Sequence, residues 1–283
     1  MLAGPTIRRR RLGADLRRLR EASSLKLEDV AERLGVAQST LSRIETGKAP
    51  TRTSYLAIML DLYGVTDQAQ RTQFTDLARE GQRKGWWTGF DELLPAGMDR
   101  YLGLEAEASA VLAYQLHLVP GLLQTEDYAR AVIAAARPDL RSEQAERLVR
   151  AQLKRQQVLL GGEFRLHVVL DESVLFRSMG PAVLMRAQLG HLAAAAASSA
   201  VTLQVLALAT AARAAPPGSF AIVTFAEPGD ADVLCAGGPG GQILLDERAA
   251  EVRAMRVIFE RLCRSALSPG PSARLIKELA RSS

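Results

Sequence analysis

The chain has 283 residues, of which 48% are hydrophobic and 24% are charged, and its mean hydropathy is close to zero. This composition excludes a wholly disordered chain and a collagen-like repeat, and two cysteines are too few for a disulfide scaffold. The length predicts about one to three domains. Charged residues begin at Arg8 and no apolar segment follows them, so we expect no secretory signal and a cytoplasmic protein with reduced thiols at Cys235 and Cys263.

Positive charge is concentrated at the N-terminal end of the chain. Residues 1–63 contain 12 Lys+Arg and 7 Asp+Glu, a net charge of +5, whereas the other 220 residues contain 24 of each kind. A basic segment beside a neutral remainder favours a polyanionic partner for that segment. A solvated tail is the alternative, because four of these charges form the run Arg8–Arg11.

Apolar residues at helical spacing predict the first helices. Leu12, Leu16 and Leu19 predict an amphipathic helix of about fifteen residues that ends at Ser23-Ser24. A second, shorter helix carries Leu27, Val30, Ala31 and Leu34, and Gly35 follows it as a residue able to adopt positive φ. A third helix spans 38–45, a fourth opens at Pro50-Thr51, and a fifth spans 67–83 with Thr66 as its cap and Phe74, Leu77 and Ala78 on one face.

The second and third helices, separated by a short turn, form a helix-turn-helix pattern, in which the later helix can enter a major groove. At about 100° per residue, Leu41, Ile44 and Ala37 lie on one face of the third helix, whereas Ser39, Ser42 and Arg43 face away from it. Gln38 projects from the N-terminal end. Arginine can pair bidentately with guanine and glutamine with adenine, so this face suits base edges and phosphates. The alternative for Arg43 is a solvated surface charge.

This segment resembles the Cro/Xre class of helix-turn-helix repressors. The residues that carry the resemblance are Leu16-Arg17-Arg18-Leu19-Arg20, Ala31, Gly35-Val36, Leu41-Ser42-Arg43-Ile44-Glu45 and Gly47-Lys48. The resemblance implies a five-helix DNA-binding domain in which Gln38, Ser39 and Arg43 reach bases, while Thr40, Ser42, Lys48 and Arg52 lie nearer the phosphates. It also implies a structural ion pair between Arg20 and Glu45.

Two positions depart from that class. Lys26 and Ala37 stand where it usually has a Ser or Thr that caps a helix. Loss of such a cap typically costs about 1 kcal/mol. We therefore expect slightly weaker, still specific DNA binding.

A linker with two adjacent tryptophans follows, at residues 84–98. Trp86 and Trp87 cannot share one helical or strand face, so they either clamp the DNA-binding domain to the rest of the chain or are buried in the core.

Residues 99–283 alternate between helical and strand patterns. We expect helices from Thr125, over 142–160 and 183–197, and at 247–266 and 271–280, with strands at 164–170, 201–208, 219–225, 232–235 and 242–245. These short, interspersed elements predict one α+β domain around a mostly antiparallel sheet. The 26 uncharged residues between Arg186 and Arg213 are long enough to cross a bilayer, but polar residues interrupt them, so they predict a buried helix followed by a strand.

No sequence pattern supports catalysis, a metal or a cofactor. His117, His167 and His191 lie in different predicted elements, and neither a metal-binding nor a nucleotide-binding motif is present. The glycine-rich segment 237–241 is most simply a hairpin loop. Asp171-Glu172 could act as an acid/base pair, but adjacent carboxylates at a strand end are more often a cap. We therefore predict a protein that is not an enzyme.

The C-terminal half resembles an actinobacterial group of Xre-type regulators, described as WhiJ-like or antitoxin-like. The segments that carry this resemblance are YLGLEAEASAVLAYQLHLVPGLLQTEDYARAVI, VLDESVLFR, FAIVTF and ALSPGPSARLI. It implies a transcription factor, often encoded beside a small partner protein.

Together these patterns predict an all-α helix-turn-helix domain at 1–83, a tryptophan-containing linker at 84–98 and an α+β domain at 99–283. We expect a cytoplasmic, nucleoid-associated regulator that binds double-stranded DNA as a homodimer, because two-fold pairing lets a dimer read two half-sites about one helical turn apart. Its C-terminal domain would receive a signal from a small partner protein encoded nearby. Alternatively, that domain binds a small molecule.

Overall fold

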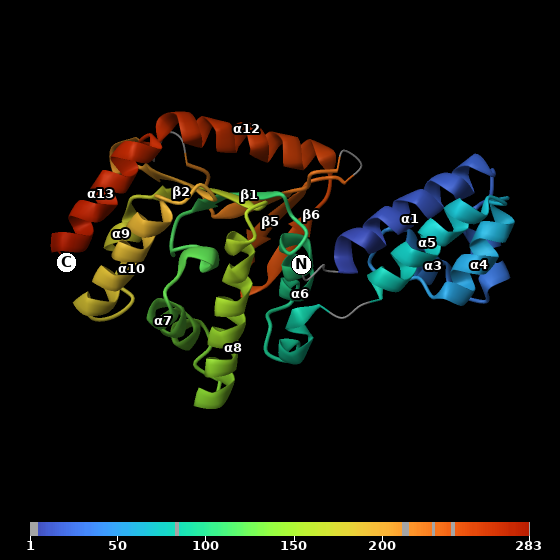
Figure 1. Cartoon of the computed structure of the whole chain (residues 1–283), viewed down its shortest axis with the longest axis horizontal. Helices are drawn as coiled ribbons and strands as arrows, with labels where there is room; N and C mark the ends of the chain where they lie inside the picture. The colour runs from blue at the N-terminus through green and yellow to red at the C-terminus, as the bar shows by residue number, and fades with distance from the viewer. Residues whose placement is uncertain (1–4, 83–84, 211–214, 228–229, 239–240, 283) are drawn as a thin grey trace. The chain divides into compact units, whose positions relative to one another are not determined.

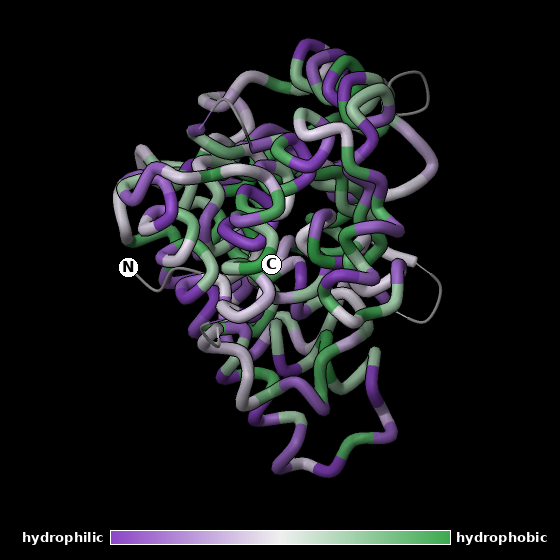
Figure 2. Tube along the Cα trace, turned by 90° about the vertical axis from the view of Figure 1, so that its right-hand side faces the viewer, coloured by the Kyte–Doolittle hydropathy of each residue, from purple (hydrophilic) through white to green (hydrophobic). Residues whose placement is uncertain are grey.

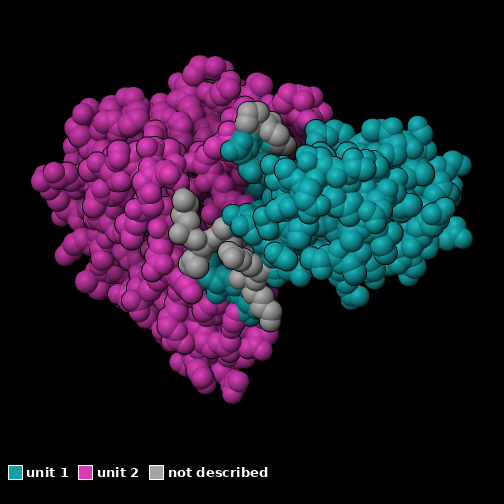
Figure 3. Space-filling model, turned by 45° about the vertical axis from the view of Figure 1, so that its right-hand side comes forward, with its two compact units in different colours: residues 1–88, 227–230 teal, residues 89–226, 231–283 magenta. Residues whose placement is uncertain are grey.

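The computed structural model describes residues 5–82, 85–210, 215–227, 230–238 and 241–282. The chain divides into two compact units, which Figure 3 shows in different colours. Unit 1 comprises residues 1–88 with 227–230, and unit 2 comprises residues 89–226 and 231–283. Unit 1 is helical, whereas unit 2 combines helices with one sheet (Figure 1).

Unit 1 contains the five predicted helices. They are α1 (Pro5–Ala22), α2 (Leu27–Leu34), α3 (Gln38–Glu45), α4 (Thr53–Leu62) and α5 (Gln68–Gly81). One face of each helix contributes to a single hydrophobic core, whose fully buried members include Leu12, Leu16, Leu41, Leu56 and Met59. The hydropathy-coloured trace of Figure 2 shows hydrophobic and hydrophilic residues alternating along the chain, as amphipathic elements require.

Local signals at the helix ends account for most of these boundaries. Gly35 follows α2 with φ +65°, the left-handed conformation predicted for it. The sequence predicted Thr66 as the N-cap residue of α5, and this prediction is wrong. Asp67 holds that position, because its carboxylate accepts hydrogen bonds from the backbone N–H groups of Ala69 and Gln70. Arg83, the last residue expected in this helix, lies outside the described residues.

The run Arg8–Arg11 is part of α1, so its interpretation as a solvated tail is wrong. Arg8 forms an ion pair with Glu80 at 2.8 Å, and the Arg9 side chain donates a hydrogen bond to the carbonyl of Gly81. Burial lowers the pKa of Arg9. Part of the basic run is therefore engaged with the end of α5.

The two tryptophans begin the 3-10 helix η1 (Trp86–Phe90). Trp87 is 6% exposed, while Trp86 is half-buried and stacks edge-to-face on it with ring centroids 5.8 Å apart. Trp87 is thus buried.

The sheet of unit 2 is mixed, which corrects the expectation of a mostly antiparallel one. Its strands are β1 (Ala110–Gln115), β2 (Arg165–Asp171), β3 (Val201–Leu206), β4 (Phe220–Thr224), β5 (Val233–Gly237) and β6 (Ile243–Asp246), in the order β3-β2-β1-β4-β5-β6. β1, β2 and β3 run parallel, because helices connect each of them to the next, whereas β4, β5 and β6 continue the sheet antiparallel. The sequence pattern predicted no strand at residues 110–115, which form β1 in the interior of the sheet.

Helices cover both faces of this sheet (Figure 1). α12 (Ala249–Ser265) packs on one face, where Val252, Phe259 and Leu262 bury Tyr114, Phe220 and Ile222. On the other side lie α6 (Met98–Glu105), α7 (Glu126–Ala136) and α8 (Ser142–Arg155) (Figure 1). α13 (Pro269–Ser282) packs against α10 (Ala182–Ala195) and β3. Short elements of unit 2 include η2 (Gly121–Leu123), η3 (Gln156–Leu160) and α9 (Ser173–Phe176).

The uncharged stretch after Arg186 forms the end of α10 and then β3, which confirms the predicted helix followed by a strand. In the part of the chain that the structure describes, no helix is both long enough and apolar enough to cross a membrane. The glycine-rich segment lies between β5 and β6, which pair antiparallel, as a hairpin connection requires. Pro239 and Gly240 of that segment lie outside the described residues.

Candidate nucleic-acid interface

Helix α3 presents a small polar face. Leu41 and Ile44 are 0% and 2% exposed, whereas Gln38, Ser39 and Arg43 are exposed, as the helical spacing predicts. Thr40 and Ser42 are half-buried at the edges of this face. Ala37 is exposed instead of buried, because it is the N-cap residue and its backbone is extended.

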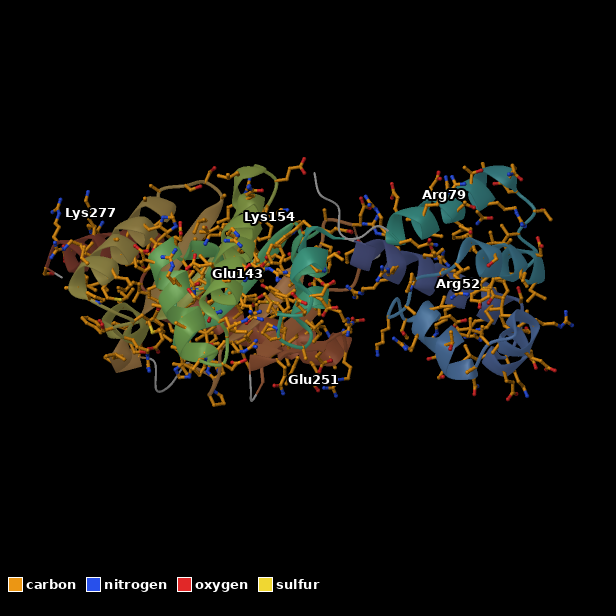
Figure 4. The ribbon with its side chains drawn as sticks, turned by 90° about the horizontal axis from the view of Figure 1, so that it is seen from below. Arg52, Arg79, Glu143, Lys154, Glu251 and Lys277 are labelled. Carbon is orange, nitrogen blue, oxygen red and sulfur yellow. The ribbon has the colours of Figure 1, made fainter. Side chains whose placement is uncertain are left out.

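The two basic residues that follow α3 are also exposed. Lys48 lies in the turn after the helix, and Arg52 is the N-cap residue of α4 (Figure 4). The guanidinium carbon of Arg52 lies 5.5 Å from the centroid of the Tyr55 ring, which holds the side chain through a cation–π contact. With Arg43, these residues provide three exposed cations on α3 or just after it.

A buried ion pair fixes the other side of α3. Arg20 on α1 donates from Nε to Oε1 of Glu45 at 2.7 Å and from Nη2 to Oε2 at 3.0 Å, and its Nη1 donates to the carbonyl of Leu25. The side chains of Arg20 and Glu45 are 11% and 4% exposed. The hydrogen bond to Glu45 is the main reason that the pKa of Arg20 is raised. The predicted structural ion pair is thus confirmed, and neither residue faces the surface of α3.

Close packing of α1 on α3 depends on Gly13, which sequence analysis did not single out. A Cβ atom there would lie 2.5 Å from the carbonyl oxygen of Ile44 and 2.6 Å from that of Glu45. Only glycine permits this approach of the two backbones. A glycine inside an otherwise amphipathic helix, one residue after Leu12, was the available signal.

The predicted absence of helix caps is confirmed at Ala37 but not fully at Lys26. No side chain caps α3 at Ala37. At α2, the carboxylate of Asp29 accepts a hydrogen bond from the backbone N–H of Lys26 at 3.2 Å, which satisfies one terminal donor.

Ala37→Ser is expected to stabilise unit 1 by about 0.5–2 kcal/mol, since its extended backbone can present the new hydroxyl to the free N–H groups of α3. Thermal unfolding followed by tryptophan fluorescence measures this change, because Trp86 and Trp87 both belong to unit 1. Ala57→Ser, at an exposed position inside α4, is the control. An equal melting temperature for Ala37→Ser and wild type would contradict the assignment of Ala37 as a vacant cap.

The candidate acid/base residues of unit 2 are engaged in structural hydrogen bonds. Asp171 is 3% exposed and accepts from the Ser173 backbone N–H at 3.0 Å and from its hydroxyl at 2.5 Å, and Glu172 accepts from the backbone N–H of Leu208 at 2.7 Å. These contacts match the expected cap.

The histidines do not assemble a metal site. Nε2 of His167 lies 2.9 Å from Oε1 of Gln204 and 3.6 Å from Sγ of Cys263, whose pKa burial raises to about 11. Among the residues that the structure describes, no group of three or more His, Cys, Asp or Glu side chains is arranged to hold a metal ion.

Comparison with known proteins gives an independent assignment of both units. The family model described as a helix-turn-helix domain matches residues 11–74, which contain α2, α3 and the polar surface of α3. The model described as a domain of unknown function, DUF5753, matches residues 98–278, more than half of the chain. No curated protein matches the chain, and no solved structure does. The helix-turn-helix match and the exposed surface of α3 together indicate a DNA-binding regulator, and the chain belongs to the DUF5753 family.

Proposed function

We propose that this protein is a sequence-specific transcriptional regulator that reads DNA with the exposed face of α3. The observation that carries the proposal is the juxtaposition of Gln38, Ser39 and Arg43 on the solvent side of a helix whose opposite side is held by Leu41, Ile44 and the Arg20–Glu45 ion pair. A recognition helix needs such rigid support, because its side chains must meet base edges at hydrogen-bond distance.

The contacts divide into two kinds. Arg43 and Gln38 carry donors and acceptors that match guanine and adenine in the major groove, and Ser39 adds a hydroxyl. Thr40, Ser42, Lys48 and Arg52 supply contacts to phosphates, which position the helix and give salt-dependent affinity. A homodimer would join two such surfaces on half-sites about one helical turn apart.

Selection from a random pool of double-stranded DNA tests this function. The proposal expects an enriched motif with two related half-sites, and size-exclusion chromatography with light scattering reports whether the bound species is a dimer. Enrichment of no motif, together with equal affinity for all duplexes, would overturn sequence-specific recognition.

Arg43→Ala is expected to weaken binding to the selected motif by about 1–3 kcal/mol and to relax discrimination at the base pair it reads. Fluorescence anisotropy at one fixed salt concentration measures this loss. Lys48→Ala should instead weaken binding to all sequences and reduce the slope of log affinity against log salt by about one. Arg79→Ala, an exposed arginine on α5, is the matched control with no expected effect (Figure 4). Equal affinity of Arg43→Ala and wild type for the motif would exclude Arg43 from readout.

Residues 99–283 would receive a regulatory signal in one of two ways. In the form that the sequence resemblance favours, a small protein encoded nearby docks on this domain and modifies DNA binding. In the other form, the domain binds a small molecule, and a cavity in unit 2 supports this second form. Purification of the tagged protein from its native host, followed by native mass spectrometry, separates a bound polypeptide from a retained small molecule.

A further inference from the structure

A cavity of about 300 Å³ lies within unit 2. The sheet forms its floor on the face opposite α12, and Met98 and Tyr101 of α6, the segment 118–122, and Arg155 at the end of α8 form its walls. Its volume lies at the lower end of the range for small-molecule sites, which are typically about 300–1,000 Å³.

A row of small residues on three neighbouring strands produces this cavity. Ala113 on β1 pairs with Ala221 on β4, which in turn pairs with Cys235 on β5, and all three line the cavity. In the neighbouring row, Val111, Val223 and Val233 occupy the corresponding positions. A valine or leucine at these three positions would fill the space above the sheet, whereas the smaller alanine and cysteine side chains leave it open.

Uncharged polar groups with unused hydrogen-bonding capacity line the same cavity. Gln124 is 7% exposed, and its Nε2 donates to the carbonyl of Val119 at 2.8 Å, while no described residue donates to its Oε1. Ser219 accepts from the backbone N–H of Leu116 at 2.9 Å, which leaves its hydroxyl proton available. The side chain of Gln115 forms no hydrogen bond with the described residues. Gln115 and Ser219 are half-buried at the cavity, so their free donors and acceptors are accessible to a ligand that enters it.

The charge of the site is already balanced. Arg155 is the charged residue among those that line the cavity, and its guanidinium donates to both carboxylate oxygens of Glu105, at 2.5 and 2.6 Å. It also lies 5.1 Å from the centroid of the Tyr101 ring. An ionised ligand would therefore lose its hydration without gaining an unpaired opposite charge, which is unfavourable in a mostly apolar site.

We infer that this cavity binds a compact, uncharged and largely apolar small molecule whose amide, carbonyl or hydroxyl group faces Gln115 and Ser219. This inference develops the small-molecule form of the proposed function. The site itself contains none of the residues proposed to contact DNA.

Saturation-transfer NMR on the full chain tests the site with three probes of one shape: 2-naphthamide, 2-naphthoate and 2-naphthylmethylammonium. We expect transfer of saturation from the protein to the neutral amide and no transfer to either ion. Ala221→Leu should abolish the amide signal, because its side chain fills the cavity. Ala250→Leu, at an exposed position on α12, is the matched control and should retain the signal.

Gln115→Leu is the second variant, and it keeps the site's volume while removing one of its polar side chains. This variant should lose the preference of wild type for 2-naphthamide over 2-methylnaphthalene. Circular dichroism shows whether Ala221→Leu folds. If Ala221→Leu does not fold, Gln115→Leu provides the test. No amide signal from wild type, equal signals from Ala221→Leu and wild type, an unaltered preference in Gln115→Leu, or stronger binding of an ion would each overturn the inference. DNA binding of the same proteins is measured separately, so a failure of the ligand site is distinguishable from a failure of DNA recognition.

Discussion

Glu105→Ala is expected to lower the free energy of unfolding of unit 2 by about 3–5 kcal/mol, the largest effect of any single substitution considered for that unit. The side chains of Glu105 and Arg155 are 3% and 11% exposed, so the substitution leaves a buried guanidinium without its carboxylate. The remaining hydrogen bonds, from Nη2 of Arg155 to the Tyr101 hydroxyl at 3.3 Å and from Nη1 to Oε1 of Gln152 at 3.5 Å, do not neutralise that charge. Hydrogen exchange of the β1 amides measures the change in unit 2.

The control for this substitution is an exposed ion pair of the same unit. Glu92 pairs with Arg147 at 2.9 Å, but its side chain is 69% exposed, so Glu92→Ala should cost less than about 1 kcal/mol. The double variant Glu105→Leu/Arg155→Met should recover most of the lost stability, since it removes both buried charges together. Equal exchange rates in Glu105→Ala and Glu92→Ala would contradict the assigned role of the buried pair.

Glu45→Ala is expected to have a comparable effect on unit 1, about 3–5 kcal/mol, because it leaves Arg20 buried between α1 and α3 without its partner. Tryptophan fluorescence during urea unfolding measures this loss. Asp15→Ala, which removes the partner of the exposed Arg18, is the control and should cost less than about 1 kcal/mol.

The same variant separates support of the recognition helix from base readout. Glu45→Ala should weaken DNA binding to every sequence in proportion to the unfolded fraction, whereas Arg43→Ala should change discrimination at one base pair. A change of sequence preference in Glu45→Ala, with unit 1 still folded, would contradict the purely structural role of Glu45.

Much of unit 1 was predictable from the sequence because the interactions that determine it are local. The leucine spacing of α1, the glycine after α2 and the span of α3 all act within a few residues. The Arg20–Glu45 ion pair, by contrast, was implied only by the resemblance to the Cro/Xre class. The exposed face of α3 followed from helix geometry alone. The sequence did not reveal the close approach at Gly13 or the capping by Asp67, because each depends on backbone positions that periodicity does not define.

The sequence of unit 2 determined where most helices and strands lie, but not how the strands pair. The direction and order of strands depend on partners that are far apart in the chain: Ala110 of β1, for example, lies opposite Thr224 of β4. That pairing alone decided that β1 is central, that the sheet is mixed, and that Ala113, Ala221 and Cys235 form one row. A cavity formed by three separate strands has no local sequence pattern, so only the tertiary structure brought its lining residues together.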